Sequence, residues 1–308
     1  MGKIVPFDRD CQLICDDAAT WLATMDAESV DLVVSSPPYN IGKSYERRTA
    51  ISDYLNRQLP VIDQLVRVLK PTGSVCWQVG NYVDRGEVFP LDIFYYNLFK
   101  ERGLQLRNRL VWHFGHGLHA SKRFSGRYET ILWFSRSNDY IFNLDDVRVP
   151  SKYPGKRYFK GDKVGELSGS PKGKNPSDFW GDLTDEWNSG VLEIPNVKAN
   201  HPEKTSHPCQ FPVELAERCV LALTDSGGLV LDPFGGVGST AIAAIKNGRR
   251  AISIDRDPEF TAMAAQRVGS FHRGELRLRP LGKPVHVPTG DRVSSVPPEW
   301  RKVAGSVY

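Results

Sequence analysis

The sequence has few cysteines, no long apolar run and little excess charge of either sign, and each shortage argues against a class of protein. Its five cysteines form no Cys-x-x-Cys pair, which opposes both a zinc finger and a disulfide framework. No run of about 18 apolar residues is present, so we expect no transmembrane helix and no membrane partner. The start, Met-Gly-Lys-Ile-Val-Pro, lacks a secretory pattern, which favours a cytoplasmic location.

Three histidines at three-residue spacing, His113, His116 and His119, are the only hint of a metal site. Gly115 and Gly117 oppose a continuous helix there, and no carboxylate or thiol completes a ligand set. We therefore expect no metal.

The composition is that of a globular chain, and it selects no function by itself. The formal net charge is +4 over 308 residues, and 40% hydrophobic residues can form one large core. Apolar strand patterns alternate with amphipathic helix patterns, which predicts a mostly parallel sheet covered on both faces. Strands are expected at 13–15, 30–34, 74–78, 108–113, 130–134, 229–231 and 251–254, and helices at 18–24, 54–69, 90–102, 213–223, 239–247 and 258–268.

Two prolines end the strand at 30–34, where the sequence reads Val-Val-Ser-Ser-Pro-Pro-Tyr. Proline neither continues a helix nor donates to a sheet ladder, so a stiff turn with available carbonyl groups is expected. This turn fixes Ser36, the Pro37 carbonyl and Tyr39 relative to one another, which suits a flat ring that carries an amine. Taken alone, the segment is equally compatible with an ordinary proline turn.

A glycine-rich motif, Asp232-Pro-Phe-Gly-Gly-Val-Gly-Ser-Thr240, connects a predicted strand to a predicted helix. Glycines let the backbone approach a ligand, and the start of the helix offers free amide groups. The Gly-Lys-Ser/Thr of a P-loop is missing, so a nucleoside triphosphate is not expected. Asp255 ends the next predicted strand, where an acidic side chain can accept hydrogen bonds from both hydroxyls of a ribose.

Together, Ser36-Pro-Pro-Tyr39 and Asp232-Pro-Phe-Gly-Gly-Val-Gly-Ser-Thr240 resemble the motifs of the S-adenosylmethionine-dependent DNA amino-methyltransferases. In the beta subgroup of that family the tetrapeptide comes first, a target-recognition region follows, and the glycine motif comes last, as in this chain. The resemblance runs from Gln12 to Arg267. It implies an α/β, Rossmann-like methyltransferase fold with a basic, loop-rich insertion. It also implies S-adenosyl-L-methionine as cofactor and double-stranded DNA as substrate.

The resemblance implies a role for the residues of both motifs and of two shorter segments. Ser36, Pro37, Pro38 and Tyr39 form the expected catalytic set. Cys15-Asp-Asp-Ala18 is similar to an acidic turn that contacts the adenine amino group, and His207-Pro-Cys-Gln-Phe-Pro to a segment that covers the methionine end of the cofactor. The expected cofactor-binding residues are Asp17, His207, Gln210, Phe211, Pro212, Asp232, Phe234, Gly236, Gly238, Ser239, Thr240 and Asp255.

Basic residues are concentrated between the two motifs. Residues 151–180 contain seven lysines and arginines against three acids, interleaved with aromatic residues and glycines. Such a mixture suits a surface that faces a polyanion, and it lies where the family keeps its target-recognition region. The expected DNA-binding residues are Lys152, Lys156, Arg157 and Lys160, together with Lys122, Arg123 and Arg127. The last three belong to a second basic group, which also contains Arg107 and Arg109 and is expected to line the same cleft.

This organisation divides the chain into four regions. Residues 1–136 form the catalytic half of the methyltransferase domain, 137–206 the target-recognition region and 207–270 the cofactor-binding half. Residues 271–308 form a basic, proline-rich tail that lies on the surface or on DNA. The resemblance is compatible with a restriction endonuclease partner and with a homodimer, and the sequence selects neither.

The implied chemistry is a direct, in-line methyl transfer to the exocyclic amine of a base flipped out of the duplex. The amine would donate hydrogen bonds to Ser36 Oγ and the Pro37 carbonyl while Tyr39 stacks on the ring. In the resembled family, a Ser at the first tetrapeptide position is more typical of N4-cytosine enzymes than of N6-adenine enzymes. We therefore expect cytosine N4 as the target, with adenine N6 as the alternative.

Three other functions stay open. Pro208-Cys209-Gln210 matches the nucleophile motif of C5-cytosine methyltransferases, although in those enzymes the glycine motif precedes the Pro-Cys. RNA and protein methyltransferases usually carry their Pro-Pro-Tyr motif after the glycine motif. The last alternative is a DNA-binding module that kept the fold and lost catalysis, which the intact motifs oppose.

Overall fold

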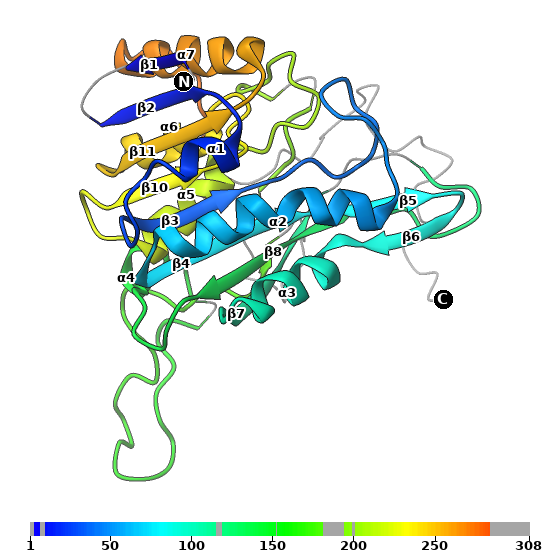
Figure 1. The fold of residues 1–308 in the computed structure, drawn as a ribbon. Helices are drawn as coiled ribbons and strands as arrows, with labels where there is room; N and C mark the ends of the chain where they lie inside the picture. Colours follow the sequence, from blue (N-terminus) through cyan, green and yellow to red (C-terminus); the bar gives the residue numbers. More distant parts are fainter. Residues whose placement is uncertain are drawn as a thin grey trace, which may run out of the picture.

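A nine-stranded sheet forms the centre of the part of the chain described by the computed structural model, namely residues 3–6, 10–114, 119–151, 153–180, 194–198 and 201–283 (Figure 1). In order across the sheet, the strands are β1 (Lys3–Pro6), β2 (Cys11–Cys15), β11 (Arg250–Asp255), β10 (Leu229–Asp232), β3 (Val30–Ser35), β4 (Leu69–Val79), β8 (Tyr128–Ser135), β7 (Gln105–His113) and β9 (Phe179–Trp180).

The two strands that carry the motifs, β3 and β10, are neighbours. β10 pairs in parallel with β3 and with β11, and β3 pairs in parallel with β4. β8 runs antiparallel to both β4 and β7, and β1 runs antiparallel to β2. The predicted fold class, a mostly parallel sheet with helices on both faces, is confirmed. The carboxyl ends of β3 and β10 consequently meet at one edge of the sheet.

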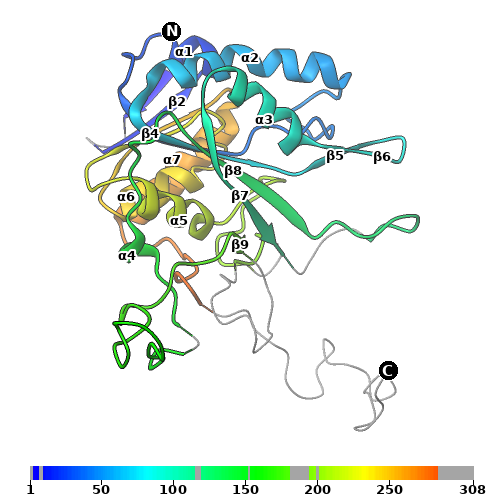
Figure 2. The ribbon, with the colours of Figure 1, turned by 90° about the horizontal axis from the view of Figure 1, so that it is seen from below.

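Six helices cover the two faces, three on each (Figure 2). One face carries α1 (Ala18–Leu22), α2 (Ile51–Val68) and α3 (Leu91–Glu101), and the other carries α5 (Val213–Leu223), α6 (Ser239–Lys246) and α7 (Pro258–His272). Each face has its own apolar core. α2 shows why these helices pack, because its buried residues Tyr54, Val61, Ile62, Leu65 and Val68 recur along one side.

Some short elements were not expected from the sequence. β5 (Asn81–Asp84) and β6 (Glu87–Pro90) form a hairpin that extends from the end of β4, and α4 (Leu144–Val147) follows β8. The hairpin turns at Arg85 and Gly86, which both have positive φ values, 46° and 90°. Such a two-residue turn favours Asn-Gly or Asp-Gly, and Arg-Gly is a weak signal for it. Among the described helices, none has the length and apolar character needed to cross a membrane.

The basic insertion leaves the sheet at the end opposite to the hairpin. β8 begins beside Val79 at the end of β4, from which the hairpin extends, and it ends at Ser135, which pairs with Ser74 in the middle of β4. A bridge between Val149 and Lys174 then closes the base of a long loop that projects away from the sheet (Figures 1 and 2).

Candidate active site

A cavity of about 760 Å³ lies where β3, β10 and β11 end, and it brings the two motifs together. Ligands of open α/β sheets bind at such carboxyl ends. Most of the motif residues predicted from the sequence line it: Asp17, Ser36, Pro37, Pro38, Tyr39, His207, Gln210, Phe211, Phe234, Gly236, Ser239 and Asp255. Pro212, Asp232, Gly238 and Thr240 belong to the same segments but do not line the cavity.

The glycine loop forms one wall of the cavity, and its shape depends on missing side chains. A Cβ at Gly235 would lie 1.8 Å from Ser253 Oγ, so no larger residue fits between this loop and β11. Gly236 adopts a positive φ of 49°, which favours glycine. At Gly235 and Gly236 the loop therefore presents backbone, rather than side chains, to the cavity.

Asp255 holds the glycine loop from the end of β11. Its Oδ2 accepts a hydrogen bond from the Gly236 amide and its Oδ1 accepts one from the Asp257 amide, both at 2.8 Å. Burial raises the pKa of the Asp255 carboxyl. Each carboxylate oxygen has a second lone pair, so the group can still accept hydrogen bonds from a ligand in the cavity.

Two other predicted acidic residues support backbone. Asp232 is 1% exposed, and its Oδ1 accepts from Ser35 Oγ at 2.5 Å and from the Phe234 amide at 3.1 Å. Burial raises the pKa of Asp232 to about 6. Asp17 caps α1 by accepting hydrogen bonds from the amide and hydroxyl of Thr20, both at 3.0 Å.

The opposite wall is a chain of side-chain hydrogen bonds. Ser36 Oγ lies 2.9 Å from the Tyr39 hydroxyl, which donates to Glu129 Oε2 at 3.2 Å. Gln78 Nε2 donates to the same Glu129 oxygen. Burial raises the pKa of Glu129 to about 7. Neither Gln78 nor Glu129 was selected from the sequence, because each lies within an apolar strand pattern and their partners are distant in the chain.

One expectation about the proline turn is wrong. Both proline carbonyls were expected to be free, but the Pro38 carbonyl accepts a 2.6 Å hydrogen bond from the Tyr54 hydroxyl. Tyr54 is in turn 2.7 Å from the Tyr95 hydroxyl. Helices α2 and α3 thus anchor the turn from behind.

Comparison with known proteins decides the family. The family model of the N6/N4 DNA methylases matches residues 30–266, which is most of the chain. This chain belongs to the N6/N4 DNA methylase family. The predicted family is therefore confirmed, and with it S-adenosyl-L-methionine as the cofactor of the family.

Individual relatives agree with this placement. The Type II methyltransferase M.BglII of Bacillus subtilis is 47% identical over 251 residues, which are 81% of this chain and 66% of that protein, so the chain spans just under two thirds of it. M.ScaI of Streptomyces caespitosus is 34% identical over 87% of this chain and 84% of its own length. The DNA adenine methyltransferase YhdJ of Escherichia coli K12 is 29% identical over 93% of both.

Solved structures show the same fold. TTHA0409 of Thermus thermophilus, determined with S-adenosyl-L-methionine, is 28% identical, with a TM-score of 0.56 over 84% of this chain and 93% of that one. The cytosine-N4-specific PvuII DNA methyltransferase has a TM-score of 0.63 over 83% of this chain and 85% of that one, at 21% identity, and is compared for its fold alone. Because the matching family model covers both N6 and N4 methylases, the family does not decide the target base.

The wall built by the glycine loop, Asp255 and His207 is called the cofactor wall here, after the role expected for it. The loop between β3 and α2 packs over this wall. Tyr45 of this loop stacks on His207 with ring centroids 5.8 Å apart, and Phe260 contacts His207 edge-on at 4.4 Å. The Glu46 carboxylate stabilises the loop by accepting hydrogen bonds from the backbone amides of Asn40 and Ile41, at 2.8 and 2.7 Å. Burial lowers the pKa of His207 to about 4, so this ring is neutral at physiological pH.

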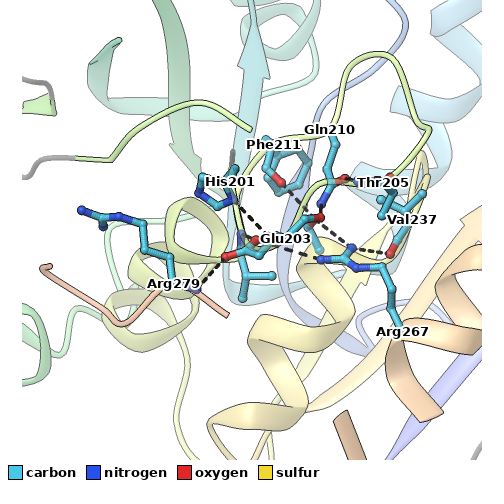
Figure 3. Close-up of polar contacts among 10 residues, drawn as sticks. His201, Glu203, Thr205, Gln210, Phe211, Val237, Arg267 and Arg279 are labelled. Carbon is cyan, nitrogen blue, oxygen red and sulfur yellow. Dashed lines mark hydrogen bonds and ion pairs between the residues drawn. The ribbon is translucent and has the colours of Figure 1, made fainter. Parts of the chain in front are cut away.

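Glu203 is a further residue that the sequence did not reveal, and it connects several segments of the cofactor wall (Figure 3). Glu203 Oε2 accepts a 2.8 Å hydrogen bond from the amide of Val213, at the start of α5. The Glu203 backbone carbonyl accepts a 2.8 Å hydrogen bond from Gln210 Nε2. The guanidinium of Arg267 lies 4.0 Å from the same carboxylate. Arg267 also donates to the carbonyl of Val237 in the glycine loop at 2.6 Å.

The first part of the C-terminal tail packs against this cluster. Glu203 Oε1 accepts a 3.2 Å hydrogen bond from the backbone amide of Arg279. The Arg279 guanidinium donates a hydrogen bond to the carboxylate of Glu214 in α5. Arg279 is only 8% exposed. The described part of the tail, up to residue 283, is thus anchored on the protein, and the rest lies outside the described residues.

The two predicted groups of DNA-binding residues lie at opposite ends of the sheet, so the expectation of one shared cleft is wrong. The segment 119–127, with Lys122, Arg123 and Arg127, extends beside the β5–β6 hairpin at the cavity end. Lys156, Arg157 and Lys160 are exposed on the projecting loop at the other end. Lys152 lies outside the described residues. The cavity rim has other cations that the sequence did not single out, namely Arg47, Arg57, Lys198 and Arg256.

Within the described part of the chain, no three His, Cys, Asp or Glu side chains are placed to hold a metal ion. His116 lies outside those residues.

Proposed function

We propose that this chain is a site-specific DNA methyltransferase that transfers a methyl group from S-adenosyl-L-methionine to N4 of cytosine in duplex DNA. The observation that carries the proposal is the Ser36 hydroxyl, which lines the cavity next to Tyr39, one strand away from the glycine loop. N6 of adenine is the alternative target, supported by the similarity to YhdJ.

The cofactor wall fits S-adenosyl-L-methionine. Its residues offer the groups that such a molecule needs, namely glycine-loop backbone, the Asp255 carboxylate and the ring of Phe234. Asp255 would accept hydrogen bonds from ribose hydroxyls. When bound, the cofactor supplies an electrophilic methyl group on a sulfonium centre.

The opposite wall of the cavity, with Ser36, Pro37, Tyr39, Gln78 and Glu129, is the acceptor wall and would position the base. The exocyclic amine is a weak nucleophile because its lone pair is delocalised into the ring. Hydrogen bonds from the amine to Ser36 Oγ and the Pro37 carbonyl would turn that lone pair toward the methyl group, while Tyr39 packs on the ring. Alignment of this kind lowers a barrier by up to about 7 kcal/mol. Stacking on Tyr39 would also offset part of the few kcal/mol needed to flip the base.

Cations at both ends of the sheet would contact DNA. Near the cavity these are Lys122, Arg123 and Arg127, and on the projecting loop they are Lys156, Arg157 and Lys160. Lys152, which lies outside the described residues, belongs to the same proposed set. The loop also exposes aromatic residues, with Tyr153 at 62% and Phe159 at 78% exposure, which suits a contact surface. The similarity to Type II methyltransferases supports a role beside a restriction endonuclease, and a DNA substrate fits the expected cytoplasmic location.

Modified-base sequencing of DNA tests the proposal. The chain is expressed in a host that lacks DNA methylation, and the expected product is N4-methylcytosine within one short sequence motif. Ser36→Ala should abolish the mark. Ser226→Ala, an exposed serine just before β10 and far from the cavity, is the matched control and should retain it.

Two outcomes would change the conclusion. Detection of N6-methyladenine would change the assigned target base from cytosine to adenine. The conclusions about the fold and the cofactor site would stay the same. A folded protein that binds S-adenosyl-L-methionine but does not methylate DNA would contradict the proposed function.

The Cys209→Ala variant tests the C5-cytosine alternative. It should keep full activity, because direct transfer to an amine needs no thiolate. A loss of activity in this variant would favour the C5-cytosine alternative.

A further inference from the structure

A continuous hydrogen-bond chain leads from the catalytic tetrapeptide to a partly buried carboxylate. Ser36 Oγ is 2.9 Å from the Tyr39 hydroxyl, and the Tyr39 hydroxyl is 3.2 Å from Glu129 Oε2. All three residues line the cavity, and they come from the turn after β3 and from β8. The packing is tight, because a Cβ on Gly80 would lie 3.1 Å from the Tyr39 ring and 3.4 Å from Glu129 Cγ.

The chain has a direction when Glu129 is ionised. A carboxylate only accepts hydrogen bonds, so the single Tyr39 hydroxyl proton points to Glu129. The Tyr39 oxygen is then the acceptor for the Ser36 hydroxyl proton. Ser36 Oγ consequently has its lone pairs free to accept a hydrogen bond from a group in the cavity.

The reaction needs an acceptor for one proton. An exocyclic amine that gains a methyl group becomes positively charged, and a buried cation without a partner is costly. The neutral product forms only when one amine proton leaves. In the proposed function, Ser36 is a residue that this amine touches.

We propose that Glu129 is the terminal proton acceptor of the methyl transfer, reached through Ser36 and Tyr39. This inference rests on the proposed function. As the nitrogen–carbon bond forms, the carbon–sulfur bond breaks and its electron pair stays on sulfur. The amine proton passes to Ser36 Oγ, the Ser36 proton to Tyr39 and the Tyr39 proton to Glu129. Glu129 becomes a neutral acid and later releases its proton to the solvent in the cavity.

The surroundings of Glu129 suit this role. Gln78 Nε2, from β4, donates to Glu129 Oε2 and helps to stabilise the ionised form. The charge of Lys198 lowers the pKa of Glu129, whereas burial raises it more, to about 7. Other ionisable residues line the same cavity, among them Tyr45, Glu46, Arg57 and Cys209. Burial raises the pKa of the Tyr45 hydroxyl, and the nearby Cys209, Glu46 and Glu129 raise it further. A carboxyl with a pKa near neutrality can accept a proton during turnover and return it afterwards.

Single-turnover methyl transfer over a range of pH tests the relay. The assay uses the full chain, saturating S-adenosyl-L-methionine and duplex DNA with the motif that the wild-type protein marks in cells. Glu129→Gln keeps the shape of the side chain and an acceptor for Tyr39 but cannot take a proton. Tyr39→Phe keeps the ring that stacks on the base but breaks the chain in the middle. Glu101→Gln, an exposed residue at the end of α3, is the matched control.

The expected result has four parts. The wild-type rate rises as the pH increases through about 7, because Glu129 must be ionised. Glu129→Gln and Tyr39→Phe each lower the rate by about 100-fold and remove this pH dependence. The double variant is no slower than either single variant, because both changes interrupt one path. Cofactor affinity and DNA affinity stay within about twofold of wild type, as does every property of Glu101→Gln.

Other outcomes would overturn the relay. Glu129→Gln at the wild-type rate would do so, as would a slow variant that keeps the wild-type pH profile. Losses that multiply in the double variant would mean that the two residues act separately. If Glu129→Gln fails to fold, Tyr39→Phe decides the question by its rate and pH profile alone. A wild-type protein that does not methylate DNA counts against the proposed function, which the relay presupposes.

Discussion

The two walls of the cavity are built in different ways. On the cofactor wall, the Asp255 carboxylate binds backbone amides of residues 19 and 2 positions away in the chain. On the acceptor wall, Tyr39 and Gln78 reach Glu129 across 90 and 51 positions, and the bonds join side chains. Around Asp255 the cofactor wall is thus a local backbone structure, whereas the acceptor wall exists only when β3, β4 and β8 are assembled. We expect variants of the two walls to affect different steps, binding on one side and transfer on the other.

The largest effect is expected from Ser36→Ala on the acceptor wall. Removal of the Ser36 hydroxyl leaves the amine without one of its hydrogen-bond partners. It also removes the first group of the proposed proton relay. The single-turnover rate should fall by about 100- to 1000-fold, as for other groups that act on the developing charge. Cofactor affinity, measured by calorimetry, should not change. A loss of cofactor affinity would contradict the expectation that the two walls serve different steps.

Asp255→Asn on the cofactor wall should produce the reverse pattern. The amide side chain can hold only one of the two backbone amides and no longer carries a charge. Cofactor affinity should fall by about 10- to 100-fold, the range for a hydrogen bond to a charged group. The rate at saturating cofactor should remain close to wild type. Asp139→Asn, an exposed residue after β8, serves as the control, and a slow Asp255→Asn at saturation would contradict the separation.

A smaller effect on the cofactor wall is expected from Glu203→Gln. The change keeps the hydrogen bond to the Val213 amide but leaves Arg267 beside a neutral side chain, which weakens its hold on the glycine loop. Cofactor affinity should fall by about fivefold, and the urea midpoint of unfolding should decrease. Unchanged affinity together with a lower midpoint would show that the Glu203 cluster supports the fold alone.

The smallest effect on catalysis is expected from the projecting loop. Lys156→Ala, Arg157→Ala and Lys160→Ala combined should leave the rate at saturating DNA unchanged. The salt dependence of DNA binding should flatten by about one unit of slope for each DNA phosphate that the variant no longer neutralises. The pair Lys122→Ala and Arg123→Ala, beside the cavity, is the comparison. If the salt dependence of DNA binding has the same slope in the loop variant as in the wild type, the loop does not contact DNA phosphates.

Local patterns in the sequence predicted most of the sheet and the helices. Hydrophobic runs and amphipathic spacing located the strands that carry both motifs and the helices that follow them, with bounds shifted by a few residues. β5 and β6 were missed because their turn, Arg85-Gly86, is a weak hairpin signal. The two-residue strand β9 exists only through its pairing with β7.

The cofactor wall was largely visible in the sequence because its parts are short, contiguous and chemically distinctive. Glycines at positions that need positive φ, and an acid at the end of the following strand, are recognisable without a structure. The roles assigned to these residues stay predictions that the experiments above address.

By itself, the sequence determined the family, the order of the main strands and helices and the two motifs that face the cavity. Only the tertiary structure decided which side chains complete the acceptor wall, that Pro38 is held by Tyr54, and that the basic groups lie apart. The physical reason is the range of the interactions. A turn or a glycine loop is set by neighbouring residues, whereas Glu129 acquires its partners, its burial and its raised pKa only when β8 packs antiparallel to β4.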